Sequence, residues 1–330
     1  MEDDGLGSHK VLSVAVGASH AMCLVSRSYP PSLEKSKVSS EKLVTDHRGS
    51  YKPHVKEAII KNVLSNTNSA PLAGLVFDMF CSSIVDVGNE LGVSSYLFFT
   101  CNADFLGLML YLPGRDDEYG GYDTFVKHGR RFKETKGIIV NNYTELEAHA
   151  VKCLLNDFED DNLHHVYTVG PLIYVKGERS IAKGEKTNKT GLVYGWTPQK
   201  EVLAHKSVGA FVSHCGWNSI LESLWFGVPT VTWPMYVEQQ INAFQMVREL
   251  GLGVELRLHY RIINGEVVVA DEIARAIKCV MESDNEVRKK VKEKSEKSRL
   301  AVMEGGSSYA ALGDLIDDIL RNKAMKEACS

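Results

Sequence analysis

Short β-rich runs alternate with helical patterns from residue 72 onward, and this alternation limits the fold more than any other feature of the sequence. In the first half each run has four to six apolar or β-branched residues bounded by Gly, Pro, Asn or Asp, which is typical of strands. Strands separated by helices form parallel sheets, so the pattern predicts an α/β fold. The predicted strands are residues 72–77, 95–99, 137–141, 166–169, 192–195, 210–213, 230–232 and 253–256.

The chain length predicts two domains, because 330 residues exceed the size of a typical single domain of about 150 residues. Residues 172–191 contain four Lys and three Gly with little periodicity, so we interpret them as a linker. An N-terminal domain is then expected over residues 31–171 and a C-terminal domain over residues 192–330. Two helices, one behind an Asp271 cap and one after residues 305–308, are expected to end the second domain.

Charge and cysteine usage exclude several classes of protein. The 38 Lys and Arg against 42 Asp and Glu leave no basic footprint for a nucleic-acid or polybasic membrane binder. The seven cysteines are odd in number and form no CxxC pair, so we expect neither a disulfide framework nor a zinc site. The same cysteine pattern predicts a cytoplasmic location. No metal-ligand spacing is present. Polar residues interrupt the apolar stretch 11–25, which predicts neither a signal peptide nor membrane insertion.

All four tryptophans lie between residues 196 and 233. Within this window, strand 210–213 is followed by Gly216 and by Asn218 or Ser219 as the expected N-cap of a helix. The positive amino end of such a helix attracts phosphate, and His214 could add a donor. Glu222 lies one helical turn further on, where it could accept hydrogen bonds from a sugar. The residues alone leave two readings open, a nucleotide or phosphosugar site and a well-capped structural helix.

The order and spacing of these residues resemble a long family signature. Trp-x-Pro-Gln at 196–199, His-Cys-Gly-Trp-Asn-Ser at 214–219, Glu222, Gly-Val-Pro at 227–229, Trp-Pro at 233–234 and Glu-Gln at 238–239 resemble the signature box of plant family 1 UDP-sugar glycosyltransferases. The resemblance extends over most of residues 34–323 and looks like the subgroup that acts on phenolic acceptors. It implies an α/β fold of GT-B type, with acceptor binding in residues 31–171 and UDP-sugar binding in residues 192–330, both Rossmann-like.

The resemblance also implies an activity. A hexose would be transferred from a UDP-sugar to a hydroxyl of a small phenolic acceptor such as a flavonoid, with inversion at the anomeric carbon. Because the box ends in Gln here, the resemblance favours glucose as that hexose. Such reactions belong to plant secondary metabolism. The UDP-sugar is a substrate, so the resemblance implies no cofactor, and it implies no metal because hydrogen-bond donors and a helix end hold the diphosphate.

The resemblance assigns ten residues to UDP-sugar binding. Trp196 would stack on uracil, Gln199 and Glu222 would hydrogen-bond the uridine, and the residues at the helix start would hold the diphosphate and the sugar. Trp225 and Trp233 are expected in the core. The ten assigned residues are Trp196, Thr197, Gln199, His214, Trp217, Asn218, Ser219, Glu222, Glu238 and Gln239.

Members of this family use a His of the N-terminal domain, oriented by an Asp, as the general base. Asp78, at the end of strand 72–77, matches the orienting Asp, and the alternative is that it caps the following helix. The only His that follows a strand-like run with a Gly three residues earlier is His20. The residues around it resemble part of a propeller blade of the regulator-of-chromosome-condensation type. We therefore expect residues 1–30 to be a foreign or disordered segment.

Two functional hypotheses remain, because the sequence is shorter than the family pattern requires. Only 24 residues separate Pro171 from Trp196, whereas two βα units need about 60. Relatives use this space for two strands and a Phe-Gly-Ser phosphate loop, which the sequence lacks. Both domains are thus expected to be incomplete in a truncated, internally deleted chain. The chain is predicted to be an active glucosyltransferase or a catalytically dead paralogue or fragment that at most binds a UDP-sugar or a partner.

Overall fold

The computed structural model describes residues 46–65, 72–115, 123–156, 165–173, 185–186, 192–193, 197–235, 237–259, 267–282 and 284–329. By its contacts the chain divides into two compact units. Unit 1 contains Met1–Asn141, Ala148–Thr168 and Ala310–Ser330, and unit 2 contains Asn142–Glu147 and Val169–Tyr309. The predicted segment 1–30 lies outside the described residues.

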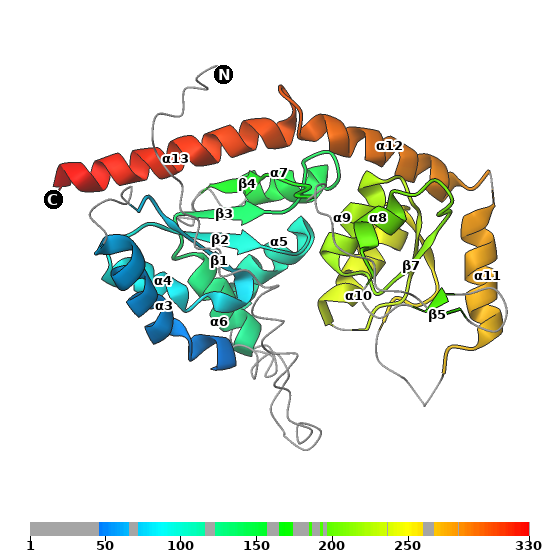
Figure 1. The fold of residues 1–330 in the computed structure, drawn as a ribbon, viewed down its shortest axis with the longest axis horizontal. Helices are drawn as coiled ribbons and strands as arrows, with labels where there is room; N and C mark the ends of the chain where they lie inside the picture. The colour runs from blue at the N-terminus through cyan, green and yellow to red at the C-terminus, as the bar shows by residue number, and fades with distance from the viewer. Residues whose placement is uncertain are drawn as a thin grey trace. The chain divides into compact units, whose positions relative to one another are not determined.

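Unit 1 is built on a parallel sheet in the order β1-β2-β3-β4 (Figure 1). Its strands are β1 (Leu75–Asp78), β2 (Ser95–Phe99), β3 (Gly137–Val140) and β4 (Val166–Thr168), so each strand predicted in this half is confirmed, some with shifted ends. All four residues of β3 are buried, as expected for a strand covered on both faces. The register places Leu75 beside Ser95 and Tyr96 beside Gly137.

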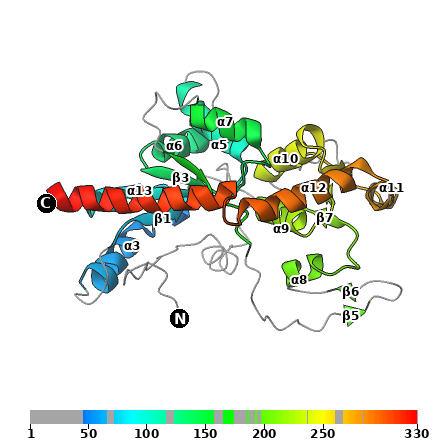
Figure 2. The same cartoon turned by 90° about the horizontal axis from the view of Figure 1, so that it is seen from above.

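Helices cover both faces of this sheet. In Figure 2, α5, α6 and α7 lie on one side of it and α3 lies on the other. The core of this unit contains aromatic contacts among its aliphatic residues, with Phe99 and Phe132 packed edge to face. The helices of unit 1 are α3 (Lys52–Ile59), α4 (Ile84–Glu90), α5 (Ala103–Tyr111), α6 (Asp123–Phe132) and α7 (Ala148–Asn156), with short turns of other helix types at Ile60–Leu64, Met79–Cys81 and Leu112–Arg115.

Unit 2 contains a second parallel sheet, in the order β7-β8-β9. Its strands are β7 (Phe211–Ser213), β8 (Thr230–Thr232) and β9 (Gly253–Glu255), which confirms the predicted alternation in the second half. Part of the predicted linker pairs with the next predicted strand, because β5 (Glu185–Lys186) lies antiparallel to β6 (Leu192–Val193). Most other residues of 172–191 lie outside the described part.

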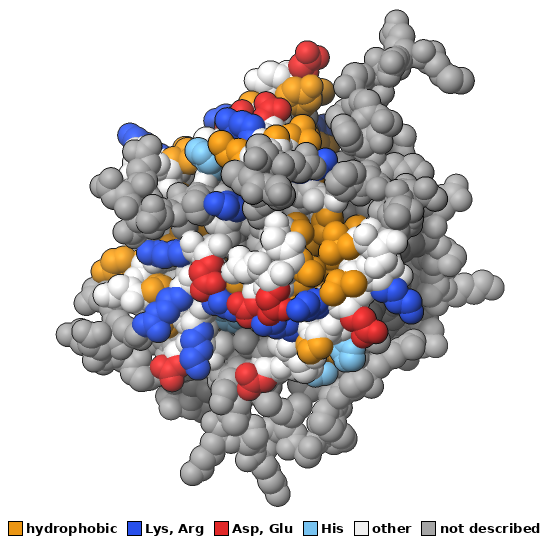
Figure 3. Space-filling view, turned by 90° about the vertical axis from the view of Figure 1, so that its left-hand side faces the viewer, with side chains coloured by type: hydrophobic (Ala, Val, Ile, Leu, Met, Phe, Trp, Pro, Cys, Tyr) orange, Lys and Arg blue, Asp and Glu red, His pale blue; other side chains and the backbone are white. Residues whose placement is uncertain are grey.

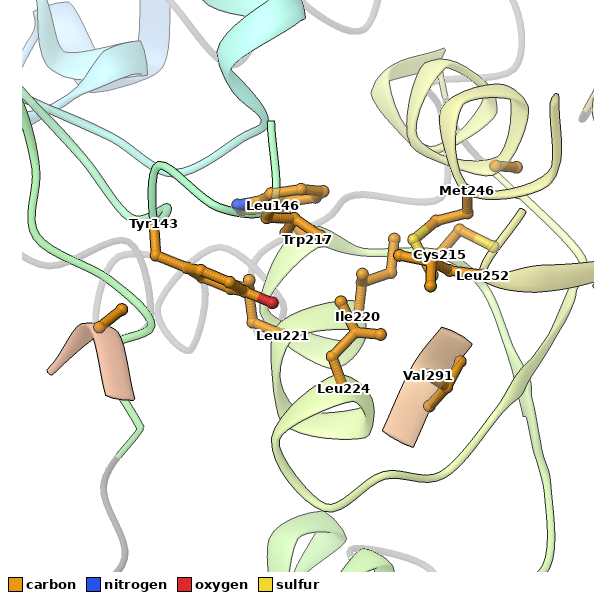
Figure 4. Packing of buried hydrophobic residues seen from close by; sticks show 12 residues of the cluster. Tyr143, Leu146, Cys215, Trp217, Ile220, Leu221, Leu224, Met246, Leu252 and Val291 are labelled. Carbon is orange, nitrogen blue, oxygen red and sulfur yellow. The ribbon is translucent and has the colours of Figure 1, made fainter. Parts of the chain in front are cut away.

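The helices of unit 2 enclose one large apolar cluster. Figure 4 shows Trp217, Ile220, Leu221 and Leu224 of α9 directed into it together with Val291. Each of these side chains is at most 3% exposed. The helices are α8 (Gln199–Leu203), α9 (Trp217–Trp225), α10 (Val237–Phe244) with a π-helical turn Gln245–Glu249, α11 (Ala270–Met281), α12 (Glu286–Ala301) and the first residues of α13 (Ser307–Cys329).

The segment Asn142–Glu147 follows β3 of unit 1 yet packs with unit 2. Tyr143 is fully buried in the apolar cluster of Figure 4, and its hydroxyl donates to the Lys294 carbonyl oxygen at 3.2 Å. The Glu147 carboxylate accepts from the side-chain amides of Asn142 at 2.6 Å and Gln245 at 2.5 Å. These buried hydrogen bonds fix the segment within unit 2.

Two predicted helix caps are wrong. Helix α9 begins at Trp217 with Gly216 as its N-cap, not Asn218 or Ser219, because the chain turns sharply at the residue before Gly216. Helix α11 begins at Ala270, and Asp271 lies inside its first turn. There the Glu272 carboxylate, rather than Asp271, accepts from the Val269 backbone N–H at 3.1 Å.

The last helix is shared between the two units, whereas the sequence placed all of it in the 192–330 domain. Its residues from Ala310 onward belong to unit 1. There Asp318 accepts a hydrogen bond from the Tyr96 hydroxyl of β2 at 3.1 Å, and Asn322 donates to the same hydroxyl at 3.0 Å. A polar contact with the sheet therefore holds this part of α13.

Candidate functional site

The turn between β7 and α9 has an unusual backbone. Cys215 has a φ of 64°, and it is the only non-glycine residue with a positive φ among those that the structure describes. Its N–H donates to the Ser213 hydroxyl at 3.0 Å. The chain passes from the strand into α9 within a few residues, so the amino end of this helix lies at the carboxyl end of β7. Strand ends of this kind are where ligands bind in parallel α/β sheets.

His214 lies over the same turn. A Cβ on Gly216 would be 2.5 Å from its Nε2 atom, so only glycine leaves room for the imidazole there. Partial burial lowers the pKa of His214 below its usual value by penalising the charged form, although much of the residue is exposed. A neutral imidazole at the amino end of a helix can donate one hydrogen bond to an anion.

A polar network joins α8 to α9. The Gln199 amide donates to Glu222 Oε2 at 2.7 Å and to the Ser219 hydroxyl at 3.1 Å. Burial raises the pKa of Glu222, while the hydrogen bond from Gln199 partly opposes that rise. Three predicted residues from two helices are thus brought together, and their oxygens lie one turn inside the amino end of α9.

The other predicted donor residues differ in exposure. Asn218 is exposed in the first turn of α9, whereas Trp217 is 3% exposed and packs into the apolar cluster. Thr197 is half-buried just before α8, and Trp196 lies outside the described residues. The indole of Trp217 is therefore directed into the core, and any contact of this residue with a ligand would involve its backbone.

Glu238 and Gln239 occupy the first turn of α10. Glu238 is half-buried, and Gln239 is 5% exposed. The Gln239 side-chain oxygen accepts from the Met235 backbone N–H at 2.9 Å, which fixes the orientation of its amide group.

Asn242 was missed by the sequence reasoning, which ended at Gln239. It lies one turn further along α10, is fully buried and donates to the Cys215 carbonyl oxygen at 2.9 Å. The only sequence signal was a polar residue in the apolar helix pattern of 238–250. The Cys215 thiol is also buried, which raises its pKa to about 12 and keeps it protonated at neutral pH.

Asp78 of unit 1 is paired with an arginine. Its Oδ1 atom accepts from Arg48 Nη1 at 3.0 Å and from the Phe80 backbone N–H at 3.0 Å, so Asp78 caps the turn Met79–Cys81 as the alternative reading predicted. Both charged side chains are at least nine-tenths buried. Burial raises the pKa of Asp78, against the lowering effects of the Phe80 N–H and Arg48. His20 lies outside the described residues.

A histidine lies near this pair, although no sequence pattern indicated it. His128 of α6 is 4% exposed, and its Nδ1 atom lies 2.8 Å from the Ser82 hydroxyl. Burial, with a smaller effect from the charge of Arg48, lowers the pKa of His128 to about 4. Its ring packs edge-on against Phe80 and stacks with Phe132, so it is a neutral core residue at pH 7.

The described residues show neither a cluster of metal ligands nor a helix suited to span a membrane. No group of three or more His, Cys, Asp or Glu side chains there is arranged to hold a metal ion. None of the helices in that part of the chain is both long and apolar enough to cross a membrane. Figure 3 shows one face of the molecule, on which acidic and basic side chains are interspersed rather than separated into patches of one sign.

Comparison with known proteins identifies relatives across most of the chain. The family model "UDP-glucoronosyl and UDP-glucosyl transferase" matches residues 141–295. UDP-glycosyltransferase 71K1 of Malus domestica is 37% identical over 82% of this chain and 80% of its own length. Anthocyanidin 3-O-glucosyltransferase 1 of Manihot esculenta is 36% identical over 82% of this chain and 84% of its own.

The alignment with the Malus domestica protein also contains many gap positions. It is 385 positions long, of which this chain supplies about 270 residues, or 82% of 330. The relative therefore has many positions inside the aligned region for which this chain has no residue. This agrees with the expected internal deletions.

Solved structures give the same result. Medicago truncatula UGT71G1 complexed with UDP-glucose has a TM-score of 0.72 and 36% identity, covering 86% of this chain and 84% of that one. A transferase from Siraitia grosvenorii in complex with UDP has a TM-score of 0.72 and 31% identity, covering 86% and 89%. The predicted GT-B type α/β fold is thereby confirmed. The chain belongs to the plant family 1 UDP-glycosyltransferases.

Proposed function

We propose that this protein transfers glucose from UDP-glucose to a hydroxyl of a small phenolic acceptor such as a flavonoid, with inversion. The relative from Manihot esculenta is named for transfer to an anthocyanidin, and the Medicago truncatula structure contains UDP-glucose. The observation that carries the proposal is the network of Gln199, Ser219 and Glu222 next to the amino end of α9. It places fixed acceptors beside a site suited to a diphosphate.

We propose a donor site built on this arrangement. Glu222, oriented by Gln199, accepts from the ribose hydroxyls, and Trp196 stacks on the uracil. The amino end of α9 with His214, Asn218 and Ser219 holds the diphosphate, and Glu238 and Gln239 contact the sugar from α10. Thr197 and Trp217 complete the proposed set. In the reaction the acceptor oxygen attacks the anomeric carbon, the bond to UDP breaks, and the acceptor proton passes to a base.

A second candidate function is donor binding without transfer. The observation that favours it is the Arg48–Asp78 pair, because the carboxylate expected to orient a basic histidine is bound by a guanidinium instead. In this case the chain binds UDP or a UDP-sugar and the transfer step does not occur. The two candidates share the donor site and differ only in turnover.

Titration calorimetry of the purified chain with UDP tests the donor site. Glu222→Gln should weaken UDP binding by about tenfold, because a neutral amide cannot accept from both ribose hydroxyls and Gln199 in the same way. Glu201→Gln, an exposed acid on α8, is the control and should bind as the parent does. Equal affinities for the two variants would contradict the site.

A transfer assay separates the two candidates. The chain is incubated with UDP-glucose and a set of flavonols, and glucosides are measured by mass spectrometry. Product formation supports the transferase, and UDP binding without product supports the second candidate. If neither occurs, both proposals fail.

The location and partners of the protein are proposed on the same basis. We expect UDP-glucose and a phenolic acceptor as its small-molecule partners and no nucleic acid, because the net charge is −4. The cysteine pattern predicts a cytoplasmic location, which stays a prediction.

A further inference from the structure

The Cys215 turn combines a conformation that L-residues rarely adopt with a position at the proposed diphosphate site. A non-glycine residue with a φ of 64° is strained and persists only where its surroundings hold it. If Cys215 relaxed to a negative φ, the following peptide would rotate. Gly216 and the first turn of α9 would then change direction, and His214 would no longer lie over Gly216.

The side-chain amide of Asn242 hydrogen-bonds the strained residue. It donates to the Cys215 carbonyl oxygen at 2.9 Å and is fully buried. The helix that carries it is itself fixed, since Ala243 and Met246 pack in the apolar cluster of unit 2. On the other side of the residue, the Ser213 hydroxyl accepts from the Cys215 N–H at 3.0 Å. The peptide groups on both sides of the strained residue are thus fixed.

We propose that Asn242 is a positioning residue of the diphosphate site. Its amide holds Cys215 in the left-handed conformation that directs the amino end of α9 and His214 toward the phosphates. The role in phosphate binding rests on the proposed function, whereas the hold on Cys215 does not.

The test compares Asn242→Ala in two backgrounds, the parent and Cys215→Gly. Glycine adopts a positive φ without strain, so it should no longer need Asn242. In the parent, Asn242→Ala should weaken UDP binding by about tenfold, measured by calorimetry. In the Cys215→Gly background, the same change should weaken binding by less than about twofold, because the turn keeps its shape. Equal losses in the two backgrounds would overturn the proposal.

Gln245→Ala is the matched control. Gln245 is also a buried amide one turn along from Asn242, but it donates to Glu147 rather than to the turn. Its replacement should lower stability without changing the affinity for UDP, and Cys215→Gly should not compensate for it. If Gln245→Ala weakens UDP binding as much as Asn242→Ala does, a general loss of packing explains the result and the proposal fails.

Unfolding measurements separate this inference from the proposed function. The loss of unfolding free energy caused by Asn242→Ala is measured with urea in both backgrounds, without UDP. A smaller loss in the Cys215→Gly background supports the hold on Cys215 even if the parent does not bind UDP, in which case only the proposed function fails. Equal losses of unfolding free energy in the two backgrounds overturn the inference that Asn242 holds Cys215. Asn242→Ser, which keeps a short donor, is measured in parallel so that the comparison does not depend on one variant folding.

Discussion

The buried pair of Arg48 and Asp78 shows how one contact can decide the role of a residue. A carboxylate this far from water is stable as an ion only with a cation and donors beside it. Arg48 Nη1 and the Phe80 N–H supply these at 3.0 Å each, and the guanidinium carbon lies 5.1 Å from the Phe80 ring centre. The Oδ2 atom of Asp78 has no hydrogen-bond partner among the described residues. One oxygen of the Asp78 carboxylate is therefore hydrogen-bonded by Arg48 and Phe80, and the other is not.

We expect Arg48→Met to lower the free energy of unfolding by about 3–5 kcal/mol, because it leaves a buried carboxylate without its cation. Adding Asp78→Asn should recover most of this loss, since the amide is neutral and its oxygen can still accept from the Phe80 N–H. Urea unfolding at pH 7 measures both effects. Arg248→Met, which breaks an exposed pair with Glu255, should cost less than about 1 kcal/mol. Similar losses at the two arginines would contradict this account.

His128 predicts a pH dependence of stability. Its pKa is lowered to about 4 in the folded chain, against about 6.5 when unfolded, so between these values the unfolded chain binds the additional proton. Stability should therefore fall as the pH decreases from about 7 to about 4. His128→Gln keeps a polar group near Ser82 and does not titrate, so its unfolding free energy should depend less on pH. An unchanged slope between pH 7 and pH 5 in this variant would exclude His128 as the cause.

At the scale of elements, the attachment of α13 to the sheet of unit 1 depends on a small polar group. Tyr96, which is fully buried on β2, donates to Asp318, and Asn322 hydrogen-bonds both. Glycine at position 137 leaves room for Tyr96 and Tyr167, since a Cβ there would be 3.2 Å and 2.9 Å from their rings. Glycine at position 137 thus leaves space for the Tyr96 ring, whose hydroxyl group hydrogen-bonds Asp318 of the helix.

Asp318→Ala should loosen this part of the helix locally. Removing the acceptor of the Tyr96 hydroxyl is expected to lower the free energy of local opening of residues 310–329 by about 1–3 kcal/mol. Hydrogen exchange of these amides measures the change. Asp317→Ala, at an exposed neighbouring position, is the control. Equal exchange rates in the two variants would show that the polar group does not hold the helix.

Much of the fold was predictable because its elements are local. Strand β2 matches its prediction at both ends, and the likeness of the window 196–239 to a family box identified Gln199, Ser219 and Glu222, which the structure brings together. Arg48 and Asn242 were not predictable, because their partners lie 30 and 27 residues away in the chain. No spacing or periodicity encodes such pairs, and only the packing of helices on the sheets creates them.

At the scale of the whole molecule, two short parallel sheets carry the fold. Strands β1 and β7 each pair on one side only among the strands described, and both carry a partly exposed valine, Val76 at 40% and Val212 at 39%. Edge strands that lack a pairing partner on one side weaken a sheet and favour its association with other chains.

A ligand that binds one unit should stabilise that unit selectively. At a UDP concentration of about 100 times Kd, the stabilisation should be about 2.7 kcal/mol. We expect hydrogen exchange to slow in β7, α9 and α10, with little change in β1–β4 of unit 1. Protection spread evenly over both units would show instead that they open as one cooperative body.

The course of the chain through the two units limits how the protein could have been shortened. Asn142–Glu147 leaves unit 1 for unit 2 and returns, and α13 begins in unit 2 and ends in unit 1. Neither unit is one continuous stretch of sequence, so no single break in the gene produces either of them whole. Deletions confined to loops or to complete βα units preserve this interleaving. Loss of the last part of α13 removes a part of unit 1.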